Sequence, residues 1–256
     1  MINQDRPISP EAAYCFSDFT ESHYREVLDL AAAKYRFAHF SENLSRPHVL
    51  WRHDVDASVH RARRLATIEA ERGLRSTFFF MLGSPFYNLF EPHTLRVAKD
   101  IADAGHWVGL HLSTNGSEHF SPETIEQKAK WERNVLSDLL GTKIGAISFH
   151  DPTPETLLAL NGEKIAGMVN VYGSAIRTLY HYCSDSNGYW RYQRLSNLLR
   201  AEQPARLHVL THPEWWTPDA MSPRERIVRC VEGRAMATMR SYDSELEQDG
   251  RENISS

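Results

Sequence analysis

The chain has 256 residues, enough to bury one large core, and its length favours one or two domains. With 41% hydrophobic residues, 24% charged residues and a mean hydropathy of -0.48, its composition is that of an ordinary globular protein. No apolar run approaches the ~20 residues that a membrane helix needs, so the sequence predicts no membrane span. The net charge of -4 lacks the basic excess of nucleic-acid-binding proteins.

The N-terminal residues and the cysteines indicate a cytoplasmic protein. Residues 1–7 lack the basic and then apolar pattern of a secretory signal. The three cysteines, Cys15, Cys183 and Cys230, form no CxxC pair, and we expect them to be reduced thiols.

Predicted helices and strands alternate along most of the chain. In order, the patterns predict a helix over 21–35, a strand over 48–56, a helix from Ser58 to Gly73, a strand over 77–82, a helix over 93–104, a strand over 107–112, a helix from Ser121 to about 140, a strand over 144–150, a short helix opening at Thr153, strands over 168–172, 177–184 and 207–211, and a long helix from Ser222.

Strands that alternate with helices are typical of a parallel sheet covered by helices. About seven such units in one chain favour an α/β fold with a closed or nearly closed (β/α) barrel of about seven parallel strands. No linker, repeat or low-complexity segment divides the chain. We therefore expect a single domain over 1–256, with an N-terminal helical extension over 1–45 and a frayed tail over 248–256.

The most informative segment ends the first strong strand, with the residues Arg52-His53-Asp54-Val55-Asp56. Residues two apart in a strand face the same side, so Asp54 and Asp56 are predicted to share a face with Arg52. Two adjacent buried carboxylates are costly unless a cation or a proton lies between them. The pair therefore indicates a metal and general-base site, or a strand end whose acids cap the next helix or pair with Arg52.

Histidines close three other predicted strands. His111, His150 and His212 all occupy such ends, where the active residues of β/α barrels lie. Each histidine taken singly is better explained as a hydrogen-bonded core group. Three together with the aspartate pair favour a site for zinc or a similar divalent ion.

At these motifs the chain resembles the polysaccharide deacetylase (NodB-like) family, specifically its members with Arg-His-Asp-Val-Asp in the first motif. The resemblance covers nearly everything from Val49 to Trp216. It is carried by Arg52-His53-Asp54-Val55-Asp56, by Gly105-His106-Trp107-Val108-Gly109-Leu110-His111, by Ser148-Phe149-His150-Asp151-Pro152, by Ser184-Asp185-Ser186-Asn187-Gly188 with Trp190-Arg191, and by Thr211-His212-Pro213.

The resemblance implies a distorted β/α barrel that removes acyl groups from amino sugars with a divalent metal, often zinc. By position, Asp54 is similar to the family's catalytic base and Asp56 to a metal ligand. His111 matches the first histidine of the family's His-x-x-x-His metal motif, and His212 matches the late histidine that acts as general acid.

Three features depart from the family pattern. Asn115 stands where the second histidine of His-x-x-x-His is expected, so we expect His150 to be the third ligand, with His119 as the alternative. His150-Asp151-Pro152 replaces the usual arginine-containing third motif, and Ala57 replaces the glycine after the acidic pair. The chain is thus a divergent enzyme, or one that has kept the barrel and lost the metal.

Five further residues near the strand ends are predicted to bind substrate: Arg52, Asn88, Asp185, Trp190 and Trp215. Tryptophan rings can stack on a sugar, although buried tryptophans more often provide apolar mass. Asn88 lies in a loop, from which it either reaches a substrate or caps the helix that follows.

The function that we predict is metal-dependent removal of an acyl group from an N-acylated amino sugar, with a small-molecule or glycan-precursor substrate and zinc as the expected ion. The alternatives are a hydrolase of a small non-sugar amide and a non-catalytic carbohydrate-binding barrel. The sequence leaves open the exact substrate, the acyl group and the oligomeric state.

Overall fold

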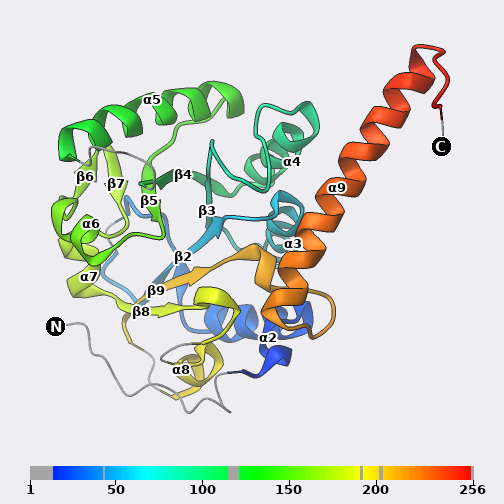
Figure 1. Ribbon diagram of the computed structural model, residues 1–256. Helices are drawn as coiled ribbons and strands as arrows, with labels where there is room; N and C mark the ends of the chain where they lie inside the picture. The colour runs from blue at the N-terminus through cyan, green and yellow to red at the C-terminus, as the bar shows by residue number, and fades with distance from the viewer. Residues whose placement is uncertain (1–13, 43, 115–120, 191–192, 202–203, 255–256) are drawn as a thin grey trace.

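The centre of the molecule is a curled, mostly parallel β-sheet (Figure 1). The computed structural model describes residues 14–42, 44–114, 121–190, 193–201 and 204–254. The strands are β1 (Arg36–Phe37), β2 (His48–Val55), β3 (Thr77–Phe80), β4 (Trp107–Ser113), β5 (Ala146–His150), β6 (Lys164–Ile165), β7 (Met168–Asn170), β8 (His181–Ser184) and β9 (Arg206–Thr211). Their spatial order is β6-β7-β5-β4-β3-β2-β9-β8, with β1 beside β2. All pairings are parallel except that of β6 with β7.

Helices surround this sheet (Figure 1). They are η1 (Phe16–Phe19), α2 (Glu21–Ala32), α3 (Val59–Ala70), α4 (Pro92–Asp103), α5 (Pro122–Leu140), α6 (Pro154–Ala159), α7 (Ser174–Leu179), η2 (Ser186–Gly188), α8 (Leu195–Ala201), η3 (Pro213–Trp215) and α9 (Pro223–Gln248). Side-chain oxygens of Thr20, Ser58, Ser121, Thr153 and Ser222 cap the N-termini of five of them, which explains where these helices begin.

All seven predicted parallel strands are present, and the fold class is confirmed as a β/α barrel type with a curled sheet. Among the described strands, β6 and β8 end the sheet and do not pair with each other, so the barrel is open there. The segment before residue 45 contains α2 and also β1, which joins the sheet. Among the described residues, no helix has both the length and the apolar character that crossing a membrane requires.

One predicted strand is half wrong. The segment over 177–184 begins inside helix α7, and only His181–Ser184 forms β8. The start of α7 is capped from a distance in sequence: a Glu163 carboxylate oxygen accepts from Ser174 Oγ at 2.5 Å and from the Ala175 backbone N–H at 3.0 Å. This contact with Glu163 favours a helix at the start of the segment, and it cannot be seen in the local sequence around residue 177.

Strand β2 is buried on both faces, which is why its sequence reads as a nearly continuous apolar run. Val49 and Trp51 pack with helix α2, whereas Leu50 packs with Phe79 inside the barrel. By the alternation of a strand, Arg52 and Asp54 follow Leu50 into the interior.

A glycine allows β4 to lie beside β3 at the register that carries His111. Gly109 pairs with Phe79, and a Cβ on Gly109 would meet the Phe79 ring at 2.3 Å. No side chain fits at that position, so Gly109 is required for this close approach. Two residues later, His111 emerges on the same face.

Candidate metal and catalytic site

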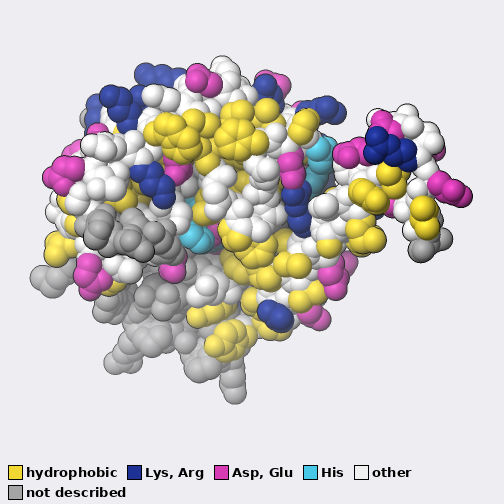
Figure 2. Space-filling model, turned by 45° about the horizontal axis from the view of Figure 1, so that its top comes forward, with side chains coloured by type: hydrophobic (Ala, Val, Ile, Leu, Met, Phe, Trp, Pro, Cys, Tyr) yellow, Lys and Arg dark blue, Asp and Glu magenta, His cyan; other side chains and the backbone are white. Residues whose placement is uncertain are grey.

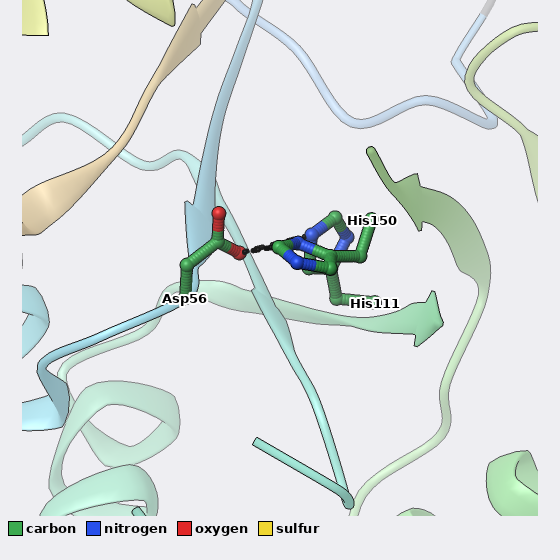
Figure 3. A group of neighbouring side chains, drawn as sticks. All are labelled: Asp56, His111 and His150. Carbon is green, nitrogen blue, oxygen red and sulfur yellow. Dashed lines mark ion pairs between the residues drawn. The ribbon is translucent and has the colours of Figure 1, made fainter. Parts of the chain in front are cut away.

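Three side chains converge at the carboxyl ends of neighbouring strands (Figure 3). Asp56 directly follows β2, His111 lies near the end of β4, and His150 ends β5. One ligand atom from each lies within 4.8 Å of the other two. Asp151, with a φ of 44°, turns the chain sharply after His150, in a backbone region where aspartate is tolerated better than most residues.

The spacing of these atoms fits a divalent ion. Asp56 Oδ1 lies 3.0 Å from His111 Nε2 and 3.5 Å from His150 Nδ1. Ligands about 2.1 Å from a tetrahedral zinc are separated by ~3.4 Å, close to both values. Asp56 Oδ1 is also a buried oxygen without a hydrogen-bond partner among the described residues. An unsatisfied carboxylate oxygen that faces two imidazoles is what a cation site requires.

The hydrogen bonds of His111 leave its Nε2 atom free to act as a ligand. Ser148 Oγ donates to Asp54 Oδ1 at 3.3 Å and lies 2.6 Å from His111 Nδ1. With its own hydrogen directed at Asp54, the hydroxyl accepts from Nδ1–H of His111. Nε2 of the neutral ring then carries the lone pair, on the side of Asp56.

The two imidazoles also control the charge of Asp56. Burial by itself would raise the pKa of the Asp56 carboxyl, but the neighbouring histidines, led by His111, hold that pKa well below its usual range. The adjacent Asp56 carboxylate raises the pKa of His150 against the effect of burial. Asp56 is therefore ionised at neutral pH, as a metal ligand must be.

Asp54 lies deeper and faces the other edge of the same imidazole. Its Oδ2 atom is 3.8 Å from His111 Nδ1 and 3.5 Å from Arg52 Nη2. Asp54 and Asp56 therefore share a face, as their spacing predicts. Arg52 is fully buried and donates to the Tyr172 hydroxyl at 2.8 Å. Arg52 was predicted to bind substrate; in the structure its guanidinium is buried and forms an ion pair with Asp54.

His212 follows β9 and is held by a buried carboxylate. Asp185 Oδ1 accepts from His212 Nδ1 at 2.7 Å, and both oxygens accept from the His212 backbone N–H, at 3.1 and 3.0 Å. Asp185 Oδ2 accepts from Trp216 Nε1 at 2.9 Å. His212 Nε2 thereby faces Asp56 Oδ2 at 3.8 Å. Asp185 was predicted to bind substrate; in the structure both of its oxygens accept hydrogen bonds from His212 or Trp216.

The charge state of His212 suits a proton donor. Burial lowers the pKa of His212, but the negative charge and hydrogen bond of Asp185 outweigh burial and raise that pKa to about 10. His212 is thus an imidazolium at neutral pH.

Sequence reasoning missed Glu214. This side chain is 2% exposed, and its Oε2 atom has no hydrogen-bond partner among the described residues. Burial and the charge of Asp56 raise the pKa of Glu214 to about 8, which keeps the carboxyl protonated at neutral pH. A neutral acid next to His212 adds a hydrogen-bond donor without competing for the cation. In the sequence, only its position two residues after His212 indicated that Glu214 could belong to the site.

The other predicted substrate residues, Trp190, Trp215 and Asn88, make packing or turn contacts. Trp190 is 1% exposed and stacks on Phe19 with ring centroids 5.3 Å apart, so it belongs to the core and not to the site. Trp215 is partly buried against the same apolar cluster. Asn88 is exposed, and its Oδ1 accepts from the Phe90 backbone N–H at 3.0 Å, which makes it a turn residue.

Asn115 and His119, the alternatives considered for the third ligand position, lie outside the described residues. Of the three candidates, His150 is the one that the structure describes, and it lies with Asp56 and His111.

No protein-family model matches the chain, and no curated protein matches it either. Among solved structures, the chain is similar to a CE4 family pseudoenzyme from Bacillus anthracis, with 16% identity over 76% of this chain and 63% of that chain and a TM-score of 0.43. It is also similar to a chitin deacetylase from Colletotrichum lindemuthianum, with 13% identity, coverages of 74% and 83% and a TM-score of 0.45. A third is the Streptococcus pyogenes deacetylase PplD in complex with acetate, with 17% identity, coverages of 81% and 85% and a TM-score of 0.41.

The chain thus spans less than two thirds of the length of the Bacillus anthracis protein. With identities of 17% or less and TM-scores of 0.45 or less, these similarities assign neither an activity nor a substrate to this chain.

Proposed function

We propose that this protein is a metal-dependent amide hydrolase that removes an acyl group from an N-acylated amino sugar. The observation that carries the proposal is the convergence of Asp56, His111 and His150, with Asp54 on one side and His212 on the other. A metal-ligand set flanked by a buried carboxylate and a protonated imidazole is the arrangement that amide hydrolysis needs.

Asp56, His111 and His150 would hold the ion, and the two imidazoles and one carboxylate favour zinc. When bound, a divalent ion supplies Lewis acidity toward a carbonyl oxygen and toward water. The remaining steps belong to side chains of the protein.

Asp54 is placed to act as the base. Its carboxylate faces the ligand cluster, and Arg52 and Ser148 hold its two oxygens in place. We assign to Asp54 the removal of a proton from the attacking water.

His212 is placed to act as the acid. Asp185 holds Nδ1, so the proton on Nε2 points toward the cluster and is the one transferred to the leaving amine. The amide bond breaks with one proton taken up by Asp54 and one given by His212, and the two side chains return to their starting states by exchange with water.

The substrate class rests on the motifs that resemble polysaccharide deacetylases. Amino sugars acylated on nitrogen present the amide that this machinery cleaves. A glycan precursor, such as a nucleotide-linked or lipid-linked sugar, is the form of substrate that we propose to test first.

The test combines metal analysis with acetate release. The purified chain should contain about one equivalent of zinc, or gain it when zinc is added, and should release acetate from at least one N-acetylated sugar in a panel with nucleotide-linked members. His111→Ala should lose the metal, whereas Asp54→Asn should keep the metal and lose ~100- to 10,000-fold in turnover. His60→Ala, on the exposed face of α3, is the matched histidine control and should behave as wild type.

Three results would argue against the proposal. A chain that neither contains metal nor responds to zinc would favour a carbohydrate-binding barrel. Cleavage of small amides but of no N-acetylated sugar would identify the substrate as a small non-sugar amide. Loss of metal in Asp54→Asn would mean that the roles of the two aspartates are exchanged.

A further inference from the structure

Helix α9 leaves the body of the protein partway along its 26 residues (Figure 1). Its first turns are anchored: Arg226 is fully buried and donates to the backbone oxygens of Gly188 at 3.4 Å and of Phe16 at 3.2 Å. Arg234 forms an ion pair with Glu91 at the start of α4. Beyond this contact the helix projects away from the barrel, as Figure 2 also shows.

Helix α9 carries an exposed apolar stripe that starts in its anchored turns and continues along the projecting part. Its members are Val228 (36% exposed), Val231 (50%), Met239 (67%) and Tyr242 (57%), together with the exposed Ala235. At about 100° per residue these five positions fall on one narrow face of the helix. An amphipathic helix normally buries such a stripe against another element.

The spacing of the stripe is symmetric about Ala235. Val231 and Val228 precede Ala235 by four and seven positions, and Met239 and Tyr242 follow it by four and seven. We propose that α9 pairs in antiparallel orientation with α9 of a second copy of this chain. Val228 then lies opposite Tyr242 of the second copy and Val231 opposite its Met239, with Ala235 at the twofold axis. The small side chain at the centre lets the two helices approach closely.

The charges beside the stripe match this orientation. On one flank Arg229 and Glu232 precede Ala235, and Arg240 and Asp243 follow it. Antiparallel pairing brings Glu232 near Arg240 of the second copy and Arg229 near its Asp243, and symmetry repeats both pairs. A parallel pair would instead turn this flank of the two copies to opposite sides of the pair, so these ion pairs could not form.

A second copy fits this surface better than a membrane does. Membrane-surface helices carry lysine and arginine beside their apolar face. The outer part of α9 instead has Asp243, Glu245 and Glu247 against the single Arg240. Because an isolated helix shorter than ~12–15 residues is marginal in water, pairing also stabilises the part that leaves the body.

Sedimentation equilibrium of the full chain over a concentration series tests the proposal. Wild type should be a dimer, and Met239→Glu should raise its dissociation constant by at least ~10-fold, since it places an unpaired charge in an apolar contact. Val231→Glu should do the same. Ser244→Glu, which adds the same charge to an exposed position off the stripe, is the matched control and should leave the constant unchanged.

Charge reversal tests the orientation. Glu232→Arg and Arg240→Glu should each weaken the dimer, and the two changes in one chain should restore it. Circular dichroism of each variant checks that the helix is intact. The proposal would be overturned by a monomeric wild type or by a Met239→Glu variant that still dimerises with the wild-type dissociation constant. It would also be overturned if the double charge reversal did not restore the affinity of the dimer. A monomer whose α9 binds lipid vesicles would overturn it as well.

Discussion

The side chain of Asp185 determines what His212 can do. Asp185 is fully buried, and its two oxygens accept hydrogen bonds from His212 and Trp216. It therefore fixes the tautomer and direction of the imidazole and stabilises its protonated form. Many hydrolases orient their acid or base in this way, with a buried carboxylate hydrogen-bonded to the catalytic imidazole.

Replacing Asp185 should change the pH dependence of activity. The pKa of His212 is raised to about 10, so the protonated acid is present below that pH and is lost as the pH rises through it. Asp185→Asn removes the charge responsible and should move the alkaline limb of the rate profile to lower pH, with a matching fall in the His212 pKa measured by NMR titration.

Asp219→Asn, at an exposed position beyond η3, is the control and should leave the profile unchanged. An alkaline limb that stays in place in Asp185→Asn would show that His212 is not the acid.

At the scale of elements, strand β2 connects the site to the helical layer. Its interior face carries Asp54, and its outer face carries His53, which lies 2.7 Å from Glu69 Oε1 of α3. Glu69 also accepts from the Tyr24 hydroxyl of α2 and from Ser76 Oγ before β3, at 2.5 Å for Ser76. One buried carboxylate thus joins β2 to two helices and so fixes the strand that carries Asp54 and leads directly into Asp56.

Removing Glu69 should destabilise the fold. Glu69→Ala leaves His53, Tyr24 and Ser76 buried without their acceptor, and loss of one partner of a buried pair costs ~3–5 kcal/mol of unfolding free energy. Urea denaturation monitored by tryptophan fluorescence measures this. The control Glu71→Ala, exposed at the end of the same helix, should stay within ~0.5 kcal/mol of wild type.

The contribution of Glu69 should also depend on pH. Burial raises the pKa of Glu69, but His53 and His106 outweigh burial and lower it below its ordinary 4.5. A carboxylate whose pKa is lower in the folded than in the unfolded chain stabilises the fold at pH values above its unfolded pKa. This stabilisation is lost as the pH falls through the folded pKa. The difference in unfolding free energy between wild type and Glu69→Ala should therefore become smaller at acidic pH. A larger difference at acidic pH would contradict the ion pair between Glu69 and His53.

At the scale of the whole molecule, the barrel gathers candidate metal ligands that are far apart in sequence. Asp56 directly follows β2, whereas His111 and His150 lie on β4 and β5, and β3 separates β2 from β4. An ion that binds all three ligands binds only the folded chain, so metal binding is coupled to global stability.

Zinc should therefore raise the melting temperature. At a free concentration of 100 times the dissociation constant the gain is ~2.7 kcal/mol, or roughly 5–10 °C for a chain of this size. Differential scanning calorimetry with and without zinc measures the shift. His111→Ala should show little or none, and an equal shift in that variant would place the ion elsewhere.

The parallel strands and most helices could be predicted because their signals are local. Apolar runs, capping residues such as Ser121 and Ser222, and proline in the first turn determine where elements begin and end. Parallel strands place their carboxyl ends at one edge of the sheet, so the sequence alone also indicated that Asp56, His111 and His150 belong together. The start of α7 could not be predicted, because a contact with Glu163 decides it.

Only the tertiary structure decided how each polar group is used. The sequence places Arg52, Asp185 and Trp190 near strand ends, but burial and hydrogen bonds make the first two supports of Asp54 and His212 and put the third in the core. Ser148 and Glu214 gain their importance from neighbours far away in the chain. Strand periodicity determines which face a residue occupies, whereas register and packing between distant segments determine which atoms it meets, and the chemistry depends on the latter.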